Sequence, residues 1–369
     1  MAKASPSSVC SYYFLFFLSL LVCDAAAAAE LPGIFIFGDS TFDVGTNNHL
    51  PKSLARANFL PNGIDFPYSV PTGRFSNGLN TADQIVRVLG YEKSPRPFLS
   101  LLDDGSTFKR NILQGVNFAS GGSGILNHTG FEPFKDVVAL GKQIEQFEIV
   151  HGILTEIIGE KATSRMLANS LFIISVGSND FFEFNKTSTT RNLSIEDYMS
   201  TLQSTYHDHL QNLFNLGARK FGILGVPPIG CCPARRPSSG SEVCEEELNE
   251  FARTFNNITE VLLQNLSSEL VGMKYSLGNT YRMISNILED PLLFGFKNIT
   301  SACCGGGKFN GERPCAYFYN PILCRNHDEY LFWDLFHPTE AVSKLAALTL
   351  FAGGTSLFQP LNFSVLVAA

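Results

Sequence analysis

The chain has 369 residues, of which 45% are apolar and 17% are charged, and its mean hydropathy is +0.08. This composition is typical of a globular protein with a large core, and it excludes disordered, collagen-like and coiled-coil chains. The formal net charge is −7 and no run of basic residues occurs, so we expect no nucleic-acid partner.

The beginning of the chain has the pattern of a secretory signal peptide. Lys3 precedes an apolar stretch over residues 12–23, and Ala25 to Ala29 supply the small residues of a cleavage site. The apolar stretch is shorter than the ~20 residues that span a bilayer, which argues against a transmembrane anchor. We therefore predict a signal peptide over residues 1–29 and a secreted, extracellular product. A single domain is expected over residues 30–369, because no linker or internal repeat follows.

The first expected strand of this domain ends in a polar turn. Residues 34–37 form a short apolar run, and Gly38-Asp39-Ser40 follows directly. In an open parallel sheet, ligands bind beyond the carboxyl ends of the strands, so Ser40 is a candidate nucleophile. The N-cap of a following helix is the alternative role for this serine.

Two further expected strands end in turns that suit the binding of negative charge. The strand over residues 115–118 leads into a glycine-rich turn over residues 119–124, whose backbone N–H groups can approach an oxyanion. No Gly-Lys-Ser/Thr ending follows, which argues against a nucleoside triphosphate site. The strand over residues 171–176 leads to Asn179. Its side-chain amide can donate to developing negative charge or form an Asx-turn.

The rest of the chain continues to alternate short strands with long helices. We expect strands over residues 220–224 and 274–277, and helices over residues 195–216, 245–270 and 339–351, the last opened by Pro338. Such alternation predicts an α/β fold, a three-layer α/β/α sandwich with a mainly parallel central sheet.

The cysteines and the glycosylation sequons both indicate a secretory route, in which disulfides form and asparagines are glycosylated. Two of the nine cysteines, Cys10 and Cys23, belong to the signal, which leaves seven. These seven are Cys231, Cys232, Cys244, Cys303, Cys304, Cys315 and Cys324. Adjacent doublets in place of Cys-x-x-Cys knuckles favour disulfides over zinc, and an odd number leaves one thiol free or intermolecular. Residues 301–328 are expected to form a long loop braced by disulfides.

The chain also carries seven Asn-X-Ser/Thr glycosylation sequons. They begin at Asn127, Asn185, Asn192, Asn257, Asn265, Asn298 and Asn362.

The last polar segment, Asp334-Leu335-Phe336-His337-Pro338, lies near the end of the chain. A hydroxyl is a poor nucleophile at neutral pH and needs an imidazole that accepts its proton and a carboxylate that orients the imidazole. A separation of three residues before a helix allows Asp334 to reach the ring of His337. Capping of the helix is the alternative role for this segment.

Together these segments resemble the GDSL-type SGNH hydrolases, and more narrowly the secreted plant GDSL esterase/lipases. The four blocks of that family occur in order, as FGDSTFDVG at 37–45, NFASGGSG at 117–124, GSND at 177–180 and DLFHPTE at 334–340. The resemblance extends over nearly the whole chain after the signal, and it implies a flavodoxin-like α/β/α fold. It departs from the family pattern at Thr41, where the name-giving motif has leucine.

Carried over by position, the resemblance implies that Ser40 is the nucleophile, His337 the base and then the acid, and Asp334 its orienting carboxylate. The oxyanion hole would use the backbone N–H groups of Ser40 and Gly122 and the side-chain amide of Asn179, with Gly121 as the second choice for the glycine. No metal or other cofactor is expected. The implied activity is the hydrolysis of small-molecule or lipid carboxylic esters through an acyl-enzyme. An extracellular polyester-forming acyltransferase and a catalytically silent binding or defence glycoprotein remain as alternatives.

Overall fold

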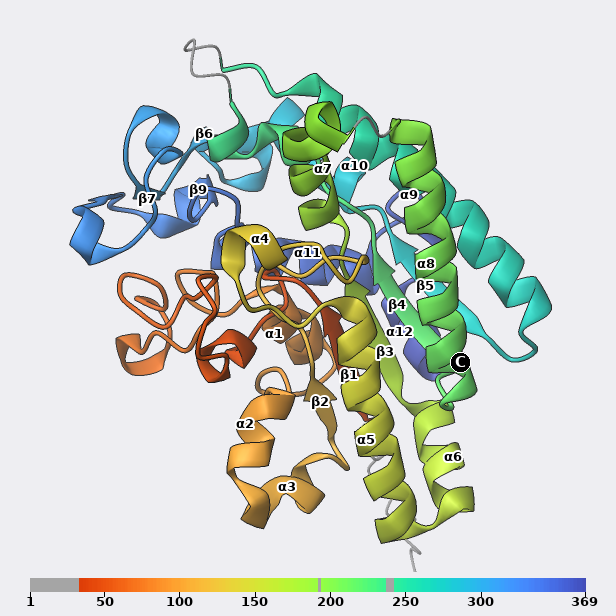
Figure 1. The fold of residues 1–369 in the computed structure, drawn as a ribbon. Helices are drawn as coiled ribbons and strands as arrows, with labels where there is room; N and C mark the ends of the chain where they lie inside the picture. The colour runs from red at the N-terminus through yellow and green to blue at the C-terminus, as the bar shows by residue number, and fades with distance from the viewer. Residues whose placement is uncertain (1–32, 192–193, 237–241) are drawn as a thin grey trace, which may run out of the picture. The chain divides into compact units, whose positions relative to one another are not determined.

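A six-stranded sheet forms the centre of the fold, in a computed structural model that describes residues 33–191, 194–236 and 242–369 (Figure 1). The strands of this sheet are β1 (Ile34–Gly38), β2 (Gly115–Asn117), β3 (Leu171–Ser175), β4 (Lys220–Leu224), β5 (Lys274–Gly278) and β10 (Phe358–Pro360). Their order is β10-β5-β4-β3-β1-β2, and all neighbours are parallel except β10 and β5. The order β2-β1-β3-β4-β5 is that of flavodoxin-like sheets.

Helices cover both faces of this sheet, as expected for three layers. The helices are α1 (Thr81–Val88), α2 (Phe98–Asp103), α3 (Gly105–Asn111), α4 (Phe131–Phe134), α5 (Leu140–Ile158), α6 (Glu160–Asn169), α7 (Ser178–Arg191), α8 (Ile195–Asn215), α9 (Glu246–Glu269), α10 (Thr280–Glu289), α11 (Glu340–Ala352) and α12 (Phe363–Ala368). In Figure 1, α5, α8 and α9 lie in front of the sheet, and α1, α11 and α12 lie behind it. The predicted α/β/α sandwich with a mainly parallel sheet is therefore confirmed.

The alternation of side chains along the strands explains why both faces need helices. Phe35 and Phe37 of β1 point into one buried cluster, and Ile34 and Ile36 point into another on the opposite face. Strands that bury both faces are continuously apolar, which is the pattern of parallel sheets.

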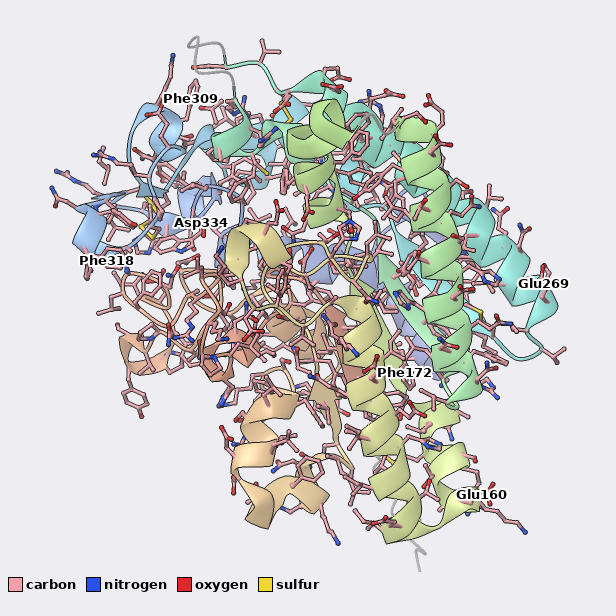
Figure 2. All side chains as sticks on the ribbon, viewed as in Figure 1. Glu160, Phe172, Glu269, Phe309, Phe318 and Asp334 are labelled. Carbon is pink, nitrogen blue, oxygen red and sulfur yellow. A yellow bond between two sulfur atoms is a disulfide. The ribbon has the colours of Figure 1, made fainter. Side chains whose placement is uncertain are left out.

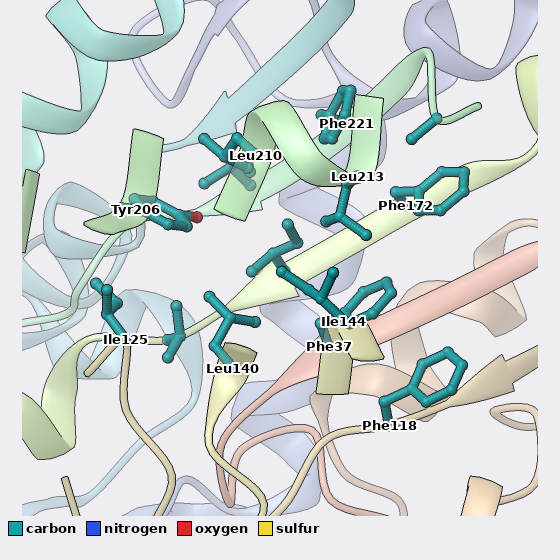
Figure 3. Close-up of a cluster of buried hydrophobic side chains, with 14 of the residues drawn as sticks. Phe37, Phe118, Ile125, Leu140, Ile144, Phe172, Tyr206, Leu210, Leu213 and Phe221 are labelled. Carbon is teal, nitrogen blue, oxygen red and sulfur yellow. The ribbon is translucent and has the colours of Figure 1, made fainter. Parts of the chain in front are cut away.

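Phenylalanine rings fill the layer between the sheet and helices α5 and α8 (Figure 3). The ring of Phe37 stacks on Phe118 with centroids 5.0 Å apart, and Phe147 of α5 meets Phe172 of β3 edge-on at 5.3 Å. These contacts fix helix α5 over β1 and β3, which matters because the candidate site lies at the carboxyl ends of these two strands.

The cysteine-rich segment is a loop braced by disulfides, as predicted. It carries the short strands β6 (Asn298–Ala302), β7 (Cys304–Gly305), β8 (Ile322–Leu323) and β9 (Tyr330–Phe332). The disulfides Cys303–Cys324 and Cys304–Cys315 cross it, and a third, Cys231–Cys244, lies before α9. Cys232 is the one thiol left over among the described residues, and it is buried.

One local expectation is wrong, and another concerns residues that the structure does not describe. Pro338 does not open helix α11, because Thr339 is its N-cap and accepts a hydrogen bond from the backbone of Val342. The predicted signal peptide, residues 1–29, lies outside the described residues. Within the part of the chain that is described, no helix combines the length and apolar character needed to cross a bilayer.

Candidate active site

Ser40 lies in a tight turn at the carboxyl end of β1. Gly38, the last residue of the strand, has φ +142°, and a Cβ there would come within 2.1 Å of the carbonyl oxygen of Ser175 on β3. Only glycine fits such a close approach. No helix begins at Ser40, and the next helical turn starts at Thr46, so the serine is not an N-cap.

The hydroxyl of Ser40 meets His337, as the motifs predict. Nε2 of His337 lies 2.7 Å from Oγ of Ser40, and Nδ1 of His337 lies 2.8 and 2.9 Å from the two carboxylate oxygens of Asp334. The three side chains form one hydrogen-bonded chain in the order that general base catalysis at a serine requires.

Asp334 is held rigidly and remains ionised. Its Oδ1 accepts hydrogen bonds from the backbone N–H groups of Phe336 and His337, at 2.9 Å each. Burial raises the pKa of Asp334, but the imidazole of His337 and these backbone donors outweigh burial, so the pKa lies below its ordinary value. A carboxylate that accepts both backbone and ring N–H groups fixes the orientation of the imidazole.

The glycine turn after β2 offers one unengaged backbone donor. The N–H of Gly121 donates to Oδ2 of Asp43 at 2.9 Å, whereas the N–H of Gly122 has no hydrogen-bond partner among the described residues. Gly122 lines the same cavity as Ser40. Its φ of +86° requires glycine. The geometry therefore favours Gly122 over Gly121 as an oxyanion donor.

Two other residues that line this cavity carry free donors. The backbone N–H of Ser40 has no partner within the described ranges. The side-chain amide of Asn179, in the first turn of α7, donates one hydrogen to the carbonyl of Ser123 at 2.9 Å, which leaves its second hydrogen available. Among the described residues, the Asn179 side chain has no hydrogen bond of the Asx-turn that was its alternative role. Both residues line the cavity with Gly122.

Two side chains from the segment after β1 clamp the glycine turn. Asp43 accepts from the N–H groups of Gly45 and Thr46 with one oxygen and from Gly121 with the other. Asn47 donates to the carbonyl of Gly121 at 2.8 Å. Burial raises the pKa of Asp43 to about 6, against these backbone donors. The nucleophile turn and the glycine turn are thus tied to each other.

Gln143 on α5 forms hydrogen bonds with the backbone of the turn that carries Ser40. This residue was not predicted from the sequence. Its Oε1 accepts from the N–H of Gly38, and its Nε2 donates to the carbonyls of Gly38 and Val138, at 2.8 Å each. Gln143 is fully buried beside Leu140 and Ile144. The signal that could have indicated it is a polar residue between apolar residues at helical spacing, because such a residue needs buried partners.

Two further sulfur and histidine features in the described part of the chain offer neither a nucleophile nor a metal ligand set. Burial raises the pKa of the Cys232 thiol to about 12, so this cavity-lining sulfur stays protonated. Cys303, Cys324 and His327 lie close together, but the two sulfurs are bonded to each other and offer no thiolate.

A cavity of about 700 Å³ contains Ser40, Asp334 and His337 in its wall. The ring of Phe75 lies against the imidazole of His337 with centroids 4.8 Å apart. Much of the remaining lining is apolar, including Phe134, Phe182 and Phe336. The shape and lining suit an apolar ligand that presents one polar bond to Ser40.

The sequons differ in their accessibility. Asn127, Asn257 and Asn265 are exposed, and Asn298 and Asn362 are half-buried. Asn192 and the side chain of Asn185 lie outside the described residues.

Comparison with known proteins assigns the family. The model of the GDSL-like lipase/acylhydrolase family matches residues 34–350. Among similar proteins of Arabidopsis thaliana, GDSL esterase/lipase At5g55050 is 35% identical over 96% of this chain and 97% of its own length. GDSL esterase/lipase At5g18430 is 36% identical over 96% of this chain and 98% of its own length. The chain belongs to the GDSL lipase/acylhydrolase family, and the predicted enzyme class, carboxylic ester hydrolase, is confirmed at the level of the family.

Proposed function

We propose that the protein is a secreted serine esterase/lipase that hydrolyses small-molecule or lipid carboxylic esters through a Ser40–His337–Asp334 triad. The observation that carries the proposal is the 2.7 Å contact between Nε2 of His337 and Oγ of Ser40, two residues 297 positions apart in the chain. A serine that only caps a helix does not require a hydrogen bond to an imidazole that a buried carboxylate orients.

In the first half of the reaction, Oγ of Ser40 attacks the ester carbonyl carbon while its proton moves to Nε2 of His337. The carbonyl oxygen becomes an oxyanion, for which the N–H groups of Ser40 and Gly122 and the amide of Asn179 are the proposed donors. The tetrahedral intermediate then expels the alcohol, which takes the proton from His337. Asp334 stabilises the imidazolium formed in between.

In the second half, water replaces the alcohol. His337 takes a proton from the water as it attacks the acyl-enzyme, and the collapse of the second intermediate returns that proton to Oγ of Ser40 as the acid leaves. The protons and electron pairs of the two halves balance through these side chains alone, so the proposal uses no cofactor.

Secretion is part of the same proposal. We propose cleavage of residues 1–29 and a mature single domain over residues 30–369. Three disulfides in the described part of the chain support an oxidising compartment. Asn127, Asn257 and Asn265 are the proposed glycan sites, because they are exposed.

The Ser40→Ala variant tests the proposal. It should abolish the hydrolysis of p-nitrophenyl butyrate and labelling by a fluorophosphonate probe, because both need Oγ as nucleophile. The circular dichroism spectrum and the thermal transition should match those of the wild type, because removal of this half-buried hydroxyl changes the packing little. The control is Ser268→Ala, which removes a hydroxyl exposed on α9. Wild-type turnover in Ser40→Ala would remove Ser40 from the mechanism.

A further inference from the structure

An exposed apolar surface borders the opening of the cavity. We call it the mouth patch, and it consists of Leu54, Phe59, Leu60, Tyr317, Phe318 and Tyr319. Leu54 is 66% exposed and also belongs to the cavity wall, so the cavity opens beside it. Phe59 and the neighbouring Pro314 line the cavity as well. The patch is therefore continuous with the site of Ser40.

Two segments far apart in the sequence build the mouth patch. The backbone N–H of Tyr317 donates to the carbonyl of Leu60 at 3.3 Å. The ring of Phe318 packs edge-on against Phe59 with centroids 5.8 Å apart, and it contacts Tyr319 at 4.5 Å. Figure 2 shows Phe318 at the margin of the molecule, where the cysteine-rich loop lies next to the loops that follow β1. The aromatic side chains thus form one connected surface.

The exposed rings stand on a braced loop that carries no charge. The segment over residues 314–323, PCAYFYNPIL, has no acidic or basic residue, although 17% of the whole chain is charged. Phe318 is 72% exposed. The disulfide Cys304–Cys315 joins the base of this segment to β7, so its rings cannot fold back easily into a core. Connected exposed apolar surface of this kind marks an interaction site.

The position of the patch decides which occupant fits. A protein partner seated on it would cover the opening through which the substrate reaches Ser40. An uncharged surface gives no attraction for a charged polymer. Phenylalanine and tyrosine rings, apolar with a polar edge in tyrosine, favour the boundary between water and an apolar phase. Of the three kinds of ligand considered for the mouth patch, this leaves the apolar substrate itself, in aggregated form.

We propose that the mouth patch binds the surface of an aggregated apolar ester, such as an emulsion droplet, and delivers single ester molecules to the cavity. This inference rests on the proposed esterase function. It names the surface of the protein that meets the substrate and the physical state of that substrate, which the triad does not define.

Tributyrin provides a direct test, because the same ester can be assayed below and above its solubility limit. The Phe318→Ser/Tyr319→Ser variant should retain wild-type kcat/KM on dissolved tributyrin, since neither side chain lines the cavity. On the emulsion at limiting droplet surface it should lose about tenfold in rate, because two apolar side chains no longer enter the droplet. The control is Val271→Ser, which removes an 89% exposed side chain before the amino end of β5, whereas the site lies at the carboxyl ends of the strands.

Droplet binding without turnover separates this inference from the proposed function. Ser40→Ala protein should sediment with tributyrin droplets, which are denser than water, and adding the two patch substitutions should release it. Equal emulsion rates for the patch variant and the wild type would overturn the inference while leaving the esterase proposal intact. A wild-type dimer in light scattering that the patch variant turns into a monomer would also overturn it, because a second copy would then occupy the patch. Inactivity of the wild type on dissolved tributyrin, with droplet binding intact, would instead contradict the esterase proposal.

Discussion

Asn179 shows how a single side chain divides its hydrogen bonds between structure and chemistry. One amide hydrogen is held by the carbonyl of Ser123 at 2.9 Å, which fixes the plane of the amide. The other hydrogen has no partner among the described residues, and Asn179 lines a cavity together with Ser40 and Gly122. A donor fixed in this way costs no reorganisation when negative charge develops on the substrate.

Replacing Asn179 by alanine should therefore lower kcat by roughly 10² to 10³, the usual loss for one oxyanion donor, with a small change in KM. Steady-state kinetics on p-nitrophenyl butyrate measure both constants. Gln264→Ala, which removes an exposed amide on α9, is the control and should leave both unchanged. An Asn179→Ala enzyme with wild-type kcat would show that this amide points away from the oxyanion.

The sequence predicts the candidate site residues but not the contacts that distinguish neighbours. Ser40 and Asn179 were chosen because each follows an apolar strand, and Asp334 because it precedes His337 by three residues. Gly122 was preferred to Gly121 only from its position in the NFASGGSG motif. The physical reason for this preference is Asp43, which engages the N–H of Gly121 from 78 positions away, and sequence patterns carry no such tertiary contact.

At the scale of elements, the parallel strands were predicted to within a residue at either end. Each is mostly buried and ends at, or directly before, a glycine, serine or asparagine, and burial on both faces leaves little ambiguity. Strand β10 was missed because it has three residues and ends in Pro360, a residue that argues against a strand. Its position at the sheet edge, antiparallel to β5, is where a proline is tolerated.

The link between helix α5 and strand β1 gives a prediction at this scale. Gln143→Met keeps the volume of the side chain but removes the partner of the Gly38 N–H and of the Val138 carbonyl. The carbonyl of Gly38 still accepts from the N–H of Ser120 and the hydroxyl of Ser123. We expect a loss of about 2–4 kcal/mol in the free energy of unfolding, since buried unpaired groups cost about 1–3 kcal/mol each. Displacement of the Ser40 turn should also lower kcat by roughly tenfold or more, with little effect on KM.

Leu154→Ala is the matched control on the same helix. This fully buried leucine makes no contact with the site through hydrogen bonds, and its truncation costs about 2–5 kcal/mol. Activity is compared at a temperature where urea titration shows both variants to be folded. A positioning role for Gln143 requires that kcat falls in Gln143→Met alone. Equal kcat values in the two variants would leave Gln143 with a purely structural role.

At the scale of the whole molecule, buried carboxyl groups connect stability to pH. Asp180 on α7 accepts hydrogen bonds from the N–H groups of Ile125 and Leu126 and from the hydroxyl of Thr129. Burial nevertheless raises its pKa to about 6. These contacts tie α7, which carries Asn179, to the segment that follows the glycine turn. The ionisation of one buried group therefore bears on both stability and the geometry of the site.

The sign of this pH dependence follows from linkage. The pKa of Asp180 is about 6 in the folded protein, and an unfolded aspartate has a pKa of about 3.9, so the folded state binds the extra proton between these values. The contribution of the Asp180 proton to the free energy of unfolding is fully present below a pH of about 3.9, and it is lost as the pH rises through about 6. Asparagine does not titrate, and all other groups are common to both proteins.

The difference in the free energy of unfolding between the wild type and Asp180→Asn should therefore favour the wild type by about 2 kcal/mol more at pH 4.5 than at pH 7.5. Urea denaturation followed by tryptophan fluorescence, with the disulfides intact, measures it at both pH values. The buried Trp333 reports the transition, since it is the only tryptophan of the chain. A difference that grows with pH would mean that the hydrogen bonds from Ile125, Leu126 and Thr129 outweigh burial and hold Asp180 ionised.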